Sequence, residues 1–561
     1  MLGTWDWGRG TRDEGQVARD EQRAASASLY PPGMFRILVS DDIGAHGIDI
    51  LEAADDAECD VNTGLSPDDL IRTIGEYDAL IVRSATKVTD AVLEAATRLK
   101  IIGRAGMGVD NIDVTAATQR GVIVMNTPSA NSVATAEQTM ALMLAATRHT
   151  AAAHQTVAEG RWERSKYAGT ELNGKTLGIV GFGRIGRLVA ARAKAFEMDV
   201  VAFDPYVSEE VAQDTGVTLV NLDDLFARSD FITLHVPSTT GTDNIISSES
   251  IAGMKDGVVI INAARGTLID EAALADALQS GKVRAAGIDV YRSEPPSPDH
   301  PLIGLPNVVH TPHLGASTAE AQRDVSAQIA AQVIDALRGT DIRNPINLPF
   351  EAGPRFAEAM PYMALADKLG VLQFHMAPSP VRRIEIEVRG DLAEKLTRPI
   401  AAALLAGLLR NHLAGDVNYV NAPLLAEQHG ITVSQAKGVA GADYTNMVSC
   451  RAHWEDGSRI MAGVLFGGSE PRLVQVSDYH LDVDPSGLLL IMLNKDVPGV
   501  IGTVGTTLGR FGVNIAEWRL GRSRPGTEAL SFINLDAEPP DEALEALRSQ
   551  EAILKLLLLR L

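Results

Sequence analysis

Short apolar runs alternate with helical stretches over the first half of the chain. The first runs are Phe35–Ser40, Asp78–Arg83 and Lys100–Arg104, and a helical stretch at Thr89–Arg98 lies between the last two. Apolar strands that are connected by helices are typical of a parallel sheet that is covered on both faces. The pattern therefore predicts a doubly wound α/β unit.

The alternation restarts after a helix candidate at Ser132–Thr150, which is rich in Ala, Leu and Met. Two doubly wound units in one chain predict a cleft between them, since open parallel sheets bind ligands beyond the carboxyl ends of their strands. A long amphipathic helix is expected at Ser317–Arg338. The strand-like runs of the second unit are Thr176–Gly181, Asp199–Asp204, Phe231–Val236, Val258–Asn262 and Ala285–Val290.

The pattern changes at Asn344–Pro349, where Asn and Pro interrupt it. Residues 350–486 alternate strand and helix less clearly and carry no motif that indicates chemistry, so we expect an α+β spacer domain there. Residues 487–561 show the order βαββαβ, which predicts a ferredoxin-like domain. Its elements are expected at Leu488–Asn494, Pro498–Phe511, Asn514–Leu520, Leu530–Asp536, Asp541–Ser549 and Ile553–Leu559.

Composition narrows the classes of function. The 561 residues suffice for about three to four domains, and a formal charge of −22 argues against nucleic acid or an anionic membrane as the main partner. No apolar run approaches the ~18 residues that cross a bilayer. Cys59 and Cys450 have no close Cys or His neighbours, so we predict no metal site and expect a cytoplasmic location. Residues 1–33 have no apolar core and are expected to be a disordered extension.

The strongest local signal is a glycine-rich loop. An apolar strand runs into Gly181, Gly183 and Gly186 in the pattern Gly-x-Gly-x-x-Gly, and a helix follows. The first glycine permits the tight turn, the second lets the backbone approach a pyrophosphate, and the third lets helix and strand pack closely. Asp204 ends the next strand, where a carboxylate binds the ribose diol and repels a 2′-phosphate. We therefore predict NAD as the cofactor, in preference to a glycine-rich turn with an unrelated surface acid.

Arg265 lies just beyond the buried strand Val258–Asn262, on the side of the sheet where ligands bind. A fixed guanidinium there can hold a carboxylate through two hydrogen bonds. A surface arginine that closes a salt bridge would show the same pattern. From position alone, both interpretations of Arg265 stay open.

A histidine and a carboxylate follow in the same half of the chain. Glu294 precedes Pro295-Pro296, and His313 lies in a turn between Pro312 and Gly315. A histidine paired with a carboxylate is the usual arrangement for general acid/base catalysis near neutral pH. His310 competes with His313, but its place in a strand-like run favours His313.

These motifs resemble the D-2-hydroxyacid dehydrogenase family, and within it the long-form phosphoglycerate dehydrogenases. The resemblance rests on Gly181–Gly186, Asn262–Gly266, Gly287–Tyr291 and Thr311–Thr318. It implies a substrate-binding domain of residues 34–132 plus 318–349 and an NAD-binding Rossmann domain of residues 133–317. The family also implies an intervening domain at 350–486 and an ACT domain at 487–561.

The resemblance also implies a role for each matching residue. Arg265 would orient the substrate, His313 would be the general acid/base, and Glu294 its partner. Arg83, Ser84, Asn111 and Arg265 would bind the substrate. The cofactor-binding set would be Gly181, Gly183, Arg184, Ile185, Gly186, Asp204, Ala263, Ala264, Arg265, Asp289, His313, Leu314, Gly315 and Ala316.

By the same resemblance, two ACT domains pair edge to edge and bind L-serine between them. Asn494, Asp496 and Asn514 would be the effector-binding residues. The family often has Arg before the Pro-Gly of this loop, where this chain has Val497, which bears on how strongly the effector binds. A ferredoxin-like module that serves as a dimer interface alone is the competing interpretation.

The expected reaction is the NAD-dependent oxidation of 3-phospho-D-glycerate to 3-phosphohydroxypyruvate, the first step of phosphorylated L-serine biosynthesis. A dehydrogenase of another D-2-hydroxy acid and a catalytically inactive sensor of NAD and an amino acid are the alternatives. The chain is expected to form a homodimer or homotetramer. Arg161, Arg164 and Lys166 surround Trp162 and either reach a neighbouring subunit's site or form an ordinary solvated surface.

Overall fold

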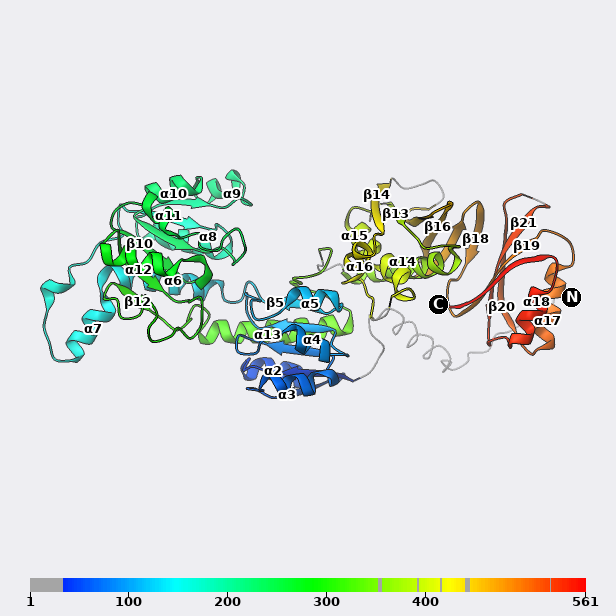
Figure 1. Cartoon of the computed structure of the whole chain (residues 1–561), viewed down its shortest axis with the longest axis horizontal. Coiled ribbons are helices and arrows are strands. Elements are labelled where there is room, and N and C mark those ends of the chain that lie inside the picture. The colour runs from blue at the N-terminus through cyan, green and yellow to red at the C-terminus, as the bar shows by residue number, and fades with distance from the viewer. Residues whose placement is uncertain (1–33, 352–355, 391–392, 414–415, 439–443, 525) are drawn as a thin grey trace, which may run out of the picture.

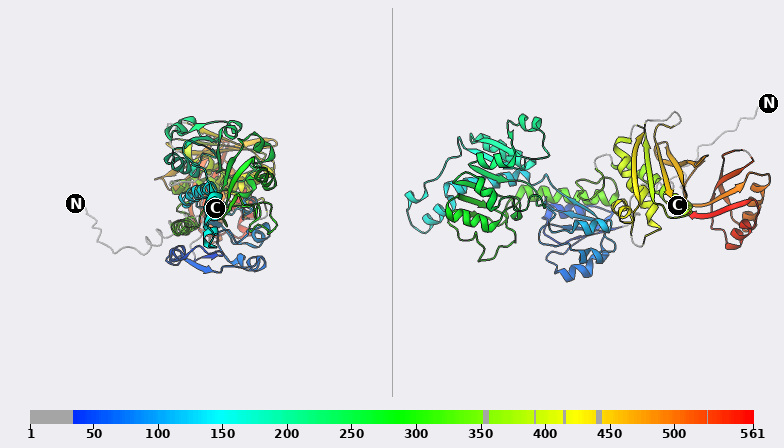
Figure 2. Two further views of the ribbon diagram at one scale, coloured as in Figure 1. Left: turned by 90° about the vertical axis from the view of Figure 1, so that its left-hand side faces the viewer. Right: turned by 45° about the horizontal axis from the view of Figure 1, so that its top comes forward.

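The computed structural model describes residues 34–351, 356–390, 393–413, 416–438, 444–524 and 526–561, so the expected extension at 1–33 lies outside it. Four units lie along an elongated molecule, and in space the first unit of the chain lies between the second and the third, as Figure 1 and the rotated views of Figure 2 show. The predicted fold class is confirmed: two parallel-sheet units precede a mixed-sheet unit and a small antiparallel unit. None of the helices in these ranges combines the length and the apolarity needed to span a bilayer.

The first unit is a parallel sheet in the order β2-β1-β3-β4-β5. Its strands are β1 (Phe35–Val39), β2 (Ala57–Val61), β3 (Ala79–Val82), β4 (Ile101–Arg104) and β5 (Ile123–Asn126). Its helices are α2 (Ala45–Glu52), α3 (Pro67–Thr73), α4 (Asp90–Ala95) and α5 (Val114–Gln119). The long helix α13 (Ala319–Arg338) returns from the second unit and packs on α2 and β4. Its apolar face, with Ile329 and Val333 fully buried, completes this core.

The second unit is a parallel sheet in the order β12-β11-β10-β9-β6-β7-β8. Its strands are β6 (Thr176–Val180), β7 (Asp199–Phe203), β8 (Thr218–Leu219), β9 (Phe231–Leu234), β10 (Val258–Asn262), β11 (Val283–Ile288) and β12 (Val308–His310). Its helices include α6 (Ser132–Arg148), α8 (Arg184–Ala195), α9 (Glu209–Asp214), α10 (Leu222–Arg228), α11 (Ser248–Gly253) and α12 (Glu271–Ser280). The strand order reverses between β6 and β9, which is where an open sheet binds a dinucleotide.

Helix α6 ends two residues before the predicted limit. His149 adopts a left-handed conformation with φ of 53°, which stops the helix. A second helix, α7 (Thr150–Ala158), and the short turn η2 (Arg164–Tyr167) then extend away from the unit at one end of the molecule (Figure 1).

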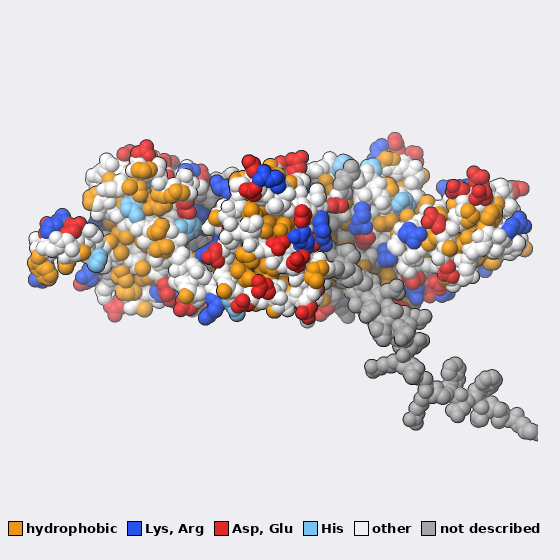
Figure 3. All heavy atoms as spheres, turned by 90° about the horizontal axis from the view of Figure 1, so that it is seen from below, with side chains coloured by type: hydrophobic (Ala, Val, Ile, Leu, Met, Phe, Trp, Pro, Cys, Tyr) orange, Lys and Arg blue, Asp and Glu red, His pale blue; other side chains and the backbone are white. Residues whose placement is uncertain are grey.

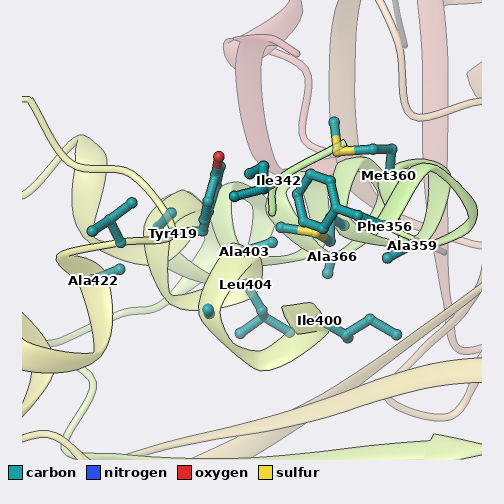
Figure 4. Packing of buried hydrophobic residues seen from close by; sticks show 14 of the residues in the cluster. Ile342, Phe356, Ala359, Met360, Ala366, Ile400, Ala403, Leu404, Tyr419 and Ala422 are labelled. Carbon is teal, nitrogen blue, oxygen red and sulfur yellow. The ribbon is translucent and has the colours of Figure 1, made fainter. Parts of the chain in front are cut away.

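The third unit has a mixed sheet in the order β14-β13-β15-β16-β17-β18. Its elements are α14 (Phe356–Met376), β13 (Arg383–Arg389), α15 (Ala393–Arg410), α16 (Ala422–Gln428), β14 (Thr432–Gly438), β15 (Met447–Trp454), β16 (Gly457–Phe466), β17 (Glu470–Val476) and β18 (Tyr479–Val483). Figure 4 shows how Phe356 and Met360 of α14 and Leu404 of α15 pack together with Ile342, which lies just after α13. One apolar core therefore joins the third unit to the first.

The fourth unit is an antiparallel sheet in the order β20-β21-β19-β22 with two helices on one face, as the ferredoxin-like pattern requires. Its elements are β19 (Leu488–Lys495), α17 (Val500–Arg510), β20 (Ile515–Arg522), β21 (Glu528–Leu535), α18 (Asp541–Arg548) and β22 (Ile553–Arg560). All six lie within two residues of their predicted bounds.

The other face of this sheet packs against the third unit. Its buried apolar side chains are Leu489, Ile491, Leu530, Phe532 and Leu559. Lys368 of α14 adds a hydrogen bond of 2.7 Å to the Pro485 carbonyl in the connecting segment. Burial of each large apolar side chain contributes about 1.5–3 kcal/mol against about 1 kcal/mol for one hydrogen bond. The third and fourth units are therefore held together mainly by apolar packing.

Candidate active site

The glycine-rich loop has the shape that a dinucleotide requires. Gly181 has φ of 96°, and a Cβ there would lie 2.5 Å from the His235 carbonyl oxygen. A Cβ on Gly186 would lie 2.2 Å from the Gly181 carbonyl oxygen, whereas Gly183 has nothing within 4 Å. Gly183 begins α8 without any side-chain cap, so the first amides of this helix can bind phosphate oxygens. Arg184 and Ile185 form the first turn of the helix beside this cradle.

Asp204 is fixed beside the same loop. Its carboxylate accepts hydrogen bonds from the Phe182 amide at 2.8 Å and from the Tyr206 amide at 2.9 Å. These two bonds hold the charge at the end of β7, where the ribose of a dinucleotide lies. The loop and this acid together fit NAD.

His235 lies beyond the end of β9 on the other side of the same crevice, and our sequence analysis did not single it out. The residue is half-buried, and desolvation of its ring lowers its pKa to about 3, so it is neutral at physiological pH. Its Nε2 contacts the Thr233 hydroxyl at 3.0 Å. A histidine at a strand end carries no sequence signal that separates it from the other eleven, so only burial distinguishes it.

The structure brings His313 and Glu294 together. His313 Nδ1 lies 2.7 Å from Glu294 Oε2, and both side chains remain partly exposed to the cleft. Burial alone would raise the pKa of Glu294, but the hydrogen bond with His313 and the Tyr291 amide outweigh it and hold the pKa below its ordinary value. The carboxylate is therefore charged at neutral pH and accepts a hydrogen bond from Nδ1–H, which leaves Nε2 to face the cleft.

Asp289 holds the loop that carries His313. This fully buried carboxylate accepts hydrogen bonds of 2.8 Å from the amides of Leu314 and Gly315 and another from the Thr311 hydroxyl. The Asp289 carbonyl also accepts the His313 amide at 2.8 Å. His313 itself has φ of 56°, a left-handed conformation that this network stabilises. Asp289 thus supports the His313 loop from its buried side. Ala316 is the next residue of this loop after Gly315.

Arg265 leaves β10 through a short turn that Asn262 organises. Asn262 donates to the Arg265 carbonyl at 2.8 Å and accepts the Ala264 amide at 3.0 Å, while Ala263 is buried in the sheet core. The Arg265 guanidinium then reaches across the cleft, where its Nε lies 2.8 Å from Asp110 of the first unit. This ion pair is a direct polar link between the two parallel-sheet units.

The loop after β3, at residues 83–87, is held in place by side chains on both sides of it. Asp41 is buried and accepts the amides of Arg83 at 2.6 Å and Thr86 at 3.1 Å. Asn111 donates from its amide to the carbonyls of the same two residues at 3.0 and 2.7 Å. The side chain of Asn111 therefore stabilises the shape of this loop. Ser84 is exposed at the tip of the loop.

Arg104 ends β4, and our sequence analysis did not select it. Burial, followed by the nearby charges of Arg265 and Arg83, lowers the pKa of Arg104 to about 10. Its Nη1 donates to the Ala105 carbonyl at 3.3 Å, but its buried Nε has no hydrogen-bond partner in the part of the chain that the structure describes. Three guanidinium groups, those of Arg104, Arg265 and Arg83, therefore lie close together. This cluster contrasts with the rest of the chain, which has a net charge of −22 and carries acidic side chains across the face shown in Figure 3.

The proposed effector residues do not form one group within a single chain. Asn494 is buried and bonds the Lys495 carbonyl at 2.8 Å, while Asp496 accepts the Gly526 amide at 2.9 Å. Asn514 bonds Asp536 at 2.6 Å. The strand register pairs Lys495 with Glu528 but pairs the start of β20 with Leu535, so Asn514 lies at the opposite end of the sheet.

The basic loop near α7 is partly neutralised by its own acids. Arg161 pairs with Glu159 and Glu163, and Lys166 pairs with Glu163. Trp162 between them is 83% exposed.

Comparison with known protein families gives three matches along the chain. Residues 140–315 match the NAD binding domain of D-isomer specific 2-hydroxyacid dehydrogenases, residues 358–477 match the D-3-phosphoglycerate dehydrogenase intervening domain, and residues 488–552 match the ACT domain. D-3-phosphoglycerate dehydrogenase of Archaeoglobus fulgidus is 44% identical over 93% of this chain and 99% of its own length. The chain belongs to the D-3-phosphoglycerate dehydrogenase family.

Other relatives and solved structures support the same assignment to this family. D-3-phosphoglycerate dehydrogenase of Bacillus subtilis is 39% identical over 94% of this chain and all of its own length. Among solved structures, a Thermus thermophilus protein aligns with a TM-score of 0.52 and 34% identity over 55% of this chain and 99% of its own. D-lactate dehydrogenase of Aquifex aeolicus, solved with NAD and lactic acid, aligns with a TM-score of 0.50 and 29% identity over 54% of this chain and 96% of its own. NAD is accordingly the cofactor of this family member.

The position of Asp204 leads to a prediction about cofactor choice. Asp204→Asn removes the charge and keeps one acceptor oxygen for the loop, so we expect NADH binding to weaken about tenfold, in line with the loss of one charge-assisted hydrogen bond. NADPH binding should improve relative to the wild type, because the repulsion of the 2′-phosphate is gone. Fluorescence titration with both cofactors measures the two affinities.

Asp214→Asn on the exposed end of α9 is the matched control, since it changes the charge of the same unit by the same amount. An Asp204→Asn enzyme with an unchanged ratio of NADH to NADPH affinity would contradict this role for Asp204.

Proposed function

We propose that this protein oxidises 3-phospho-D-glycerate to 3-phosphohydroxypyruvate with NAD, the first step of phosphorylated L-serine biosynthesis. The observation that carries the proposal is the convergence of Arg265, Arg104 and Arg83 beside the His313–Glu294 pair. The histidine can act as a base on the hydroxyl group of a hydroxy acid. The neighbouring arginines can bind its carboxylate and a second anionic group. Family membership and the match of the relatives over their full lengths support the same activity.

The charges of the substrate match the cleft. Arg265 suits the carboxylate, because it is the arginine whose charge acts on Glu294, the partner of His313. Arg104 and Arg83 suit the phosphate. The buried Nε of Arg104 has no hydrogen-bond partner among the described residues, and the positive charge of Arg83 lowers the pKa of Arg104. A bound dianion would relieve the mutual repulsion of the guanidinium groups.

Proton transfer follows from the orientation of His313. When bound, NAD supplies the acceptor for the hydride that leaves C2 of the substrate. His313 Nε2 takes the proton of the C2 hydroxyl, while the Nδ1 proton stays on the hydrogen bond to Glu294. The charged carboxylate stabilises the imidazolium that forms. General base catalysis of this kind contributes about 10²–10⁴-fold to the rate.

We also propose regulation by L-serine bound between two ACT domains. Strand β20 is an edge strand of the sheet, so a second copy can pair with it in antiparallel orientation. Such pairing would bring the start of one β20, where Asn514 lies, next to the end of the other, where Arg522 contacts Asp496 at 3.5 Å. A zwitterion between Asp496 and the partner's asparagine would then link the two copies.

A homo-oligomer in the cytoplasm is part of this proposal. Exposed Trp162 near α7 and the free edge of β20 supply two surfaces for contact between copies. The two cysteines are unpaired thiols, as expected in a reducing compartment.

The direct test is a steady-state assay with NAD and 3-phosphoglycerate in comparison with D-glycerate and D-lactate. His313→Ala should lower kcat by at least about 10²-fold through loss of the base, while NADH still binds. His46→Ala, on the exposed face of α2, is the matched control. Unchanged turnover of the His313→Ala enzyme would refute the assignment of the base.

Arg104 provides a test of substrate choice. Arg104→Met fills the buried space without charge, so KM for 3-phosphoglycerate should rise about 10–100-fold, as expected for a lost charge-assisted hydrogen bond. Catalysis on D-glycerate, which lacks the phosphate, should change less than about threefold in kcat/KM. Equal losses on both substrates would exclude Arg104 as a phosphate ligand, and Arg98→Met controls for the loss of one arginine.

Asp496 provides a test of regulation. Asp496→Asn should raise the L-serine concentration for half-inhibition at least about tenfold, because the ammonium group of the effector loses its counter-charge. Each enzyme's rate without serine serves as its own reference. Asp541→Asn, exposed at the start of α18, is the control. An unaltered response of the Asp496→Asn enzyme would place the effector elsewhere.

A further inference from the structure

A cluster of aromatic and titratable side chains lies directly behind Glu294, and neither the mechanism nor the cofactor site uses it. Tyr291 is at its centre, between His310 at the end of β12 and His300. Glu271, the first residue of α12, closes the cluster with its Oε2 3.0 Å from His300 Nε2. All four side chains come from segments that border the carboxyl end of the second sheet.

The ring of Tyr291 is held on three sides. It stacks on His310 with ring centroids 6.3 Å apart and an interplanar angle of 20°, and it meets the edge of His300 at 5.5 Å and 89°. Its hydroxyl lies 2.8 Å from His310 Nδ1. The residue is only 7% exposed, so the His310 contact lies in a largely buried environment.

The protonation states make this contact a donor–acceptor pair. Burial, with the charges of Asp289, Glu271 and Glu294, raises the pKa of Tyr291 to about 12, so its hydroxyl keeps the proton. Burial and the neighbouring His300 lower the pKa of His310. A neutral His310 can therefore accept the tyrosine proton at Nδ1 near neutral pH.

The backbone of the same loop holds Glu294. The Tyr291 amide donates to Glu294 Oε1 at 3.1 Å, and the next amide, that of Arg292, donates to Glu271 Oε1 at 2.9 Å. Two successive amides are thus each bound to a carboxylate. Glu294 Oε2 is left to face His313.

Gly266 permits this arrangement. A Cβ on Gly266 would lie 1.9 Å from the Tyr291 carbonyl carbon, so the loop that carries Arg265 and the loop that carries Glu294 are in direct backbone contact. A change in the orientation of the Tyr291 peptide would therefore displace both the loop that carries Arg265 and the loop that carries Glu294.

We propose that Tyr291 is a positioning residue for catalysis, and that its hydrogen bond to His310 fixes the amide that aims Glu294 at His313. The proposal rests on the proposed function of the His313–Glu294 pair. Tyr291 touches neither substrate nor cofactor in this account. It acts through Glu294, which itself faces His313 and Arg265.

Tyr291→Phe and His310→Phe test the contact, because each keeps an aromatic ring in place and removes one partner of the hydrogen bond. We expect each variant to lower kcat about tenfold with KM within twofold, a fraction of the whole acid/base contribution. The double variant should be no slower than the slower single variant, since both remove the same bond. The acidic limb of kcat/KM for oxidation should move to lower pH, because a loosened Glu294 stabilises the imidazolium less.

Tyr77→Phe is the matched control. It removes another buried tyrosine hydroxyl, which bonds Asp60 at 2.9 Å in the first unit, away from the cleft. Its kcat and pH profile should equal those of the wild type, which separates positioning from general loss of stability.

Two results would overturn the proposal. One is a Tyr291→Phe enzyme with wild-type kcat and pH profile, and the other is a double variant whose loss is the product of the single losses. A crystal structure of the Tyr291→Phe variant tests the positioning role of Tyr291 separately from the proposed function, because its readout is a contact within the protein and needs no substrate. The Glu294–His313 contact of 2.7 Å should be lengthened or lost in it, and an unaltered contact would refute the role of Tyr291 independently of the substrate.

Discussion

One hydrogen bond, between Nδ1 of His313 and Glu294, determines which nitrogen of the imidazole faces the cleft. A carboxylate can only accept at this position while it is charged, so Nδ1 must carry the proton and Nε2 must be the free base. Both partners of this bond, the His313 loop and the Glu294 carboxylate, are held in place by further hydrogen bonds. Asp289 binds the amides of the His313 loop, and the Tyr291 amide binds the second oxygen of Glu294.

The positive charge of the cleft is the second condition for function. Arg104 is half-buried near Arg265 and Arg83. Desolvation and these two charges lower its pKa, and the charges of Asp110 and Asp41 offset this effect only in part. Because Arg265 belongs to one sheet unit and Asp110 to the other, their ion pair also links the two units beside the cluster of arginines. Such a site attracts small multivalent anions even though the chain as a whole is strongly acidic.

Much of this could be predicted from the sequence, because the signals are local. The glycine spacing, Asp204 after the next strand and the place of His313 in a turn follow from short-range rules. The position of Arg265 left two interpretations open, and its role came from the resemblance to the family. Strand β2 could not be predicted, since Ala57–Val61 mixes polar and apolar residues at a sheet edge. Arg104 has the same sequence signature as Arg83, at the end of an apolar strand, and only the three-dimensional surroundings of its guanidinium separate the two. The distance of Asn514 from Asp496 depends on strand register, which pairs residues from different hairpins.

The most direct test of this account is a crystal structure of the protein with NADH and 3-phosphoglycerate bound. The account predicts Nε2 of His313 at the C2 hydroxyl with Glu294 still on Nδ1, the carboxylate on Arg265, and the phosphate on Arg104 and Arg83. A ligand whose phosphate contacts neither of these last two arginines, or whose hydroxyl lies away from His313, would contradict it.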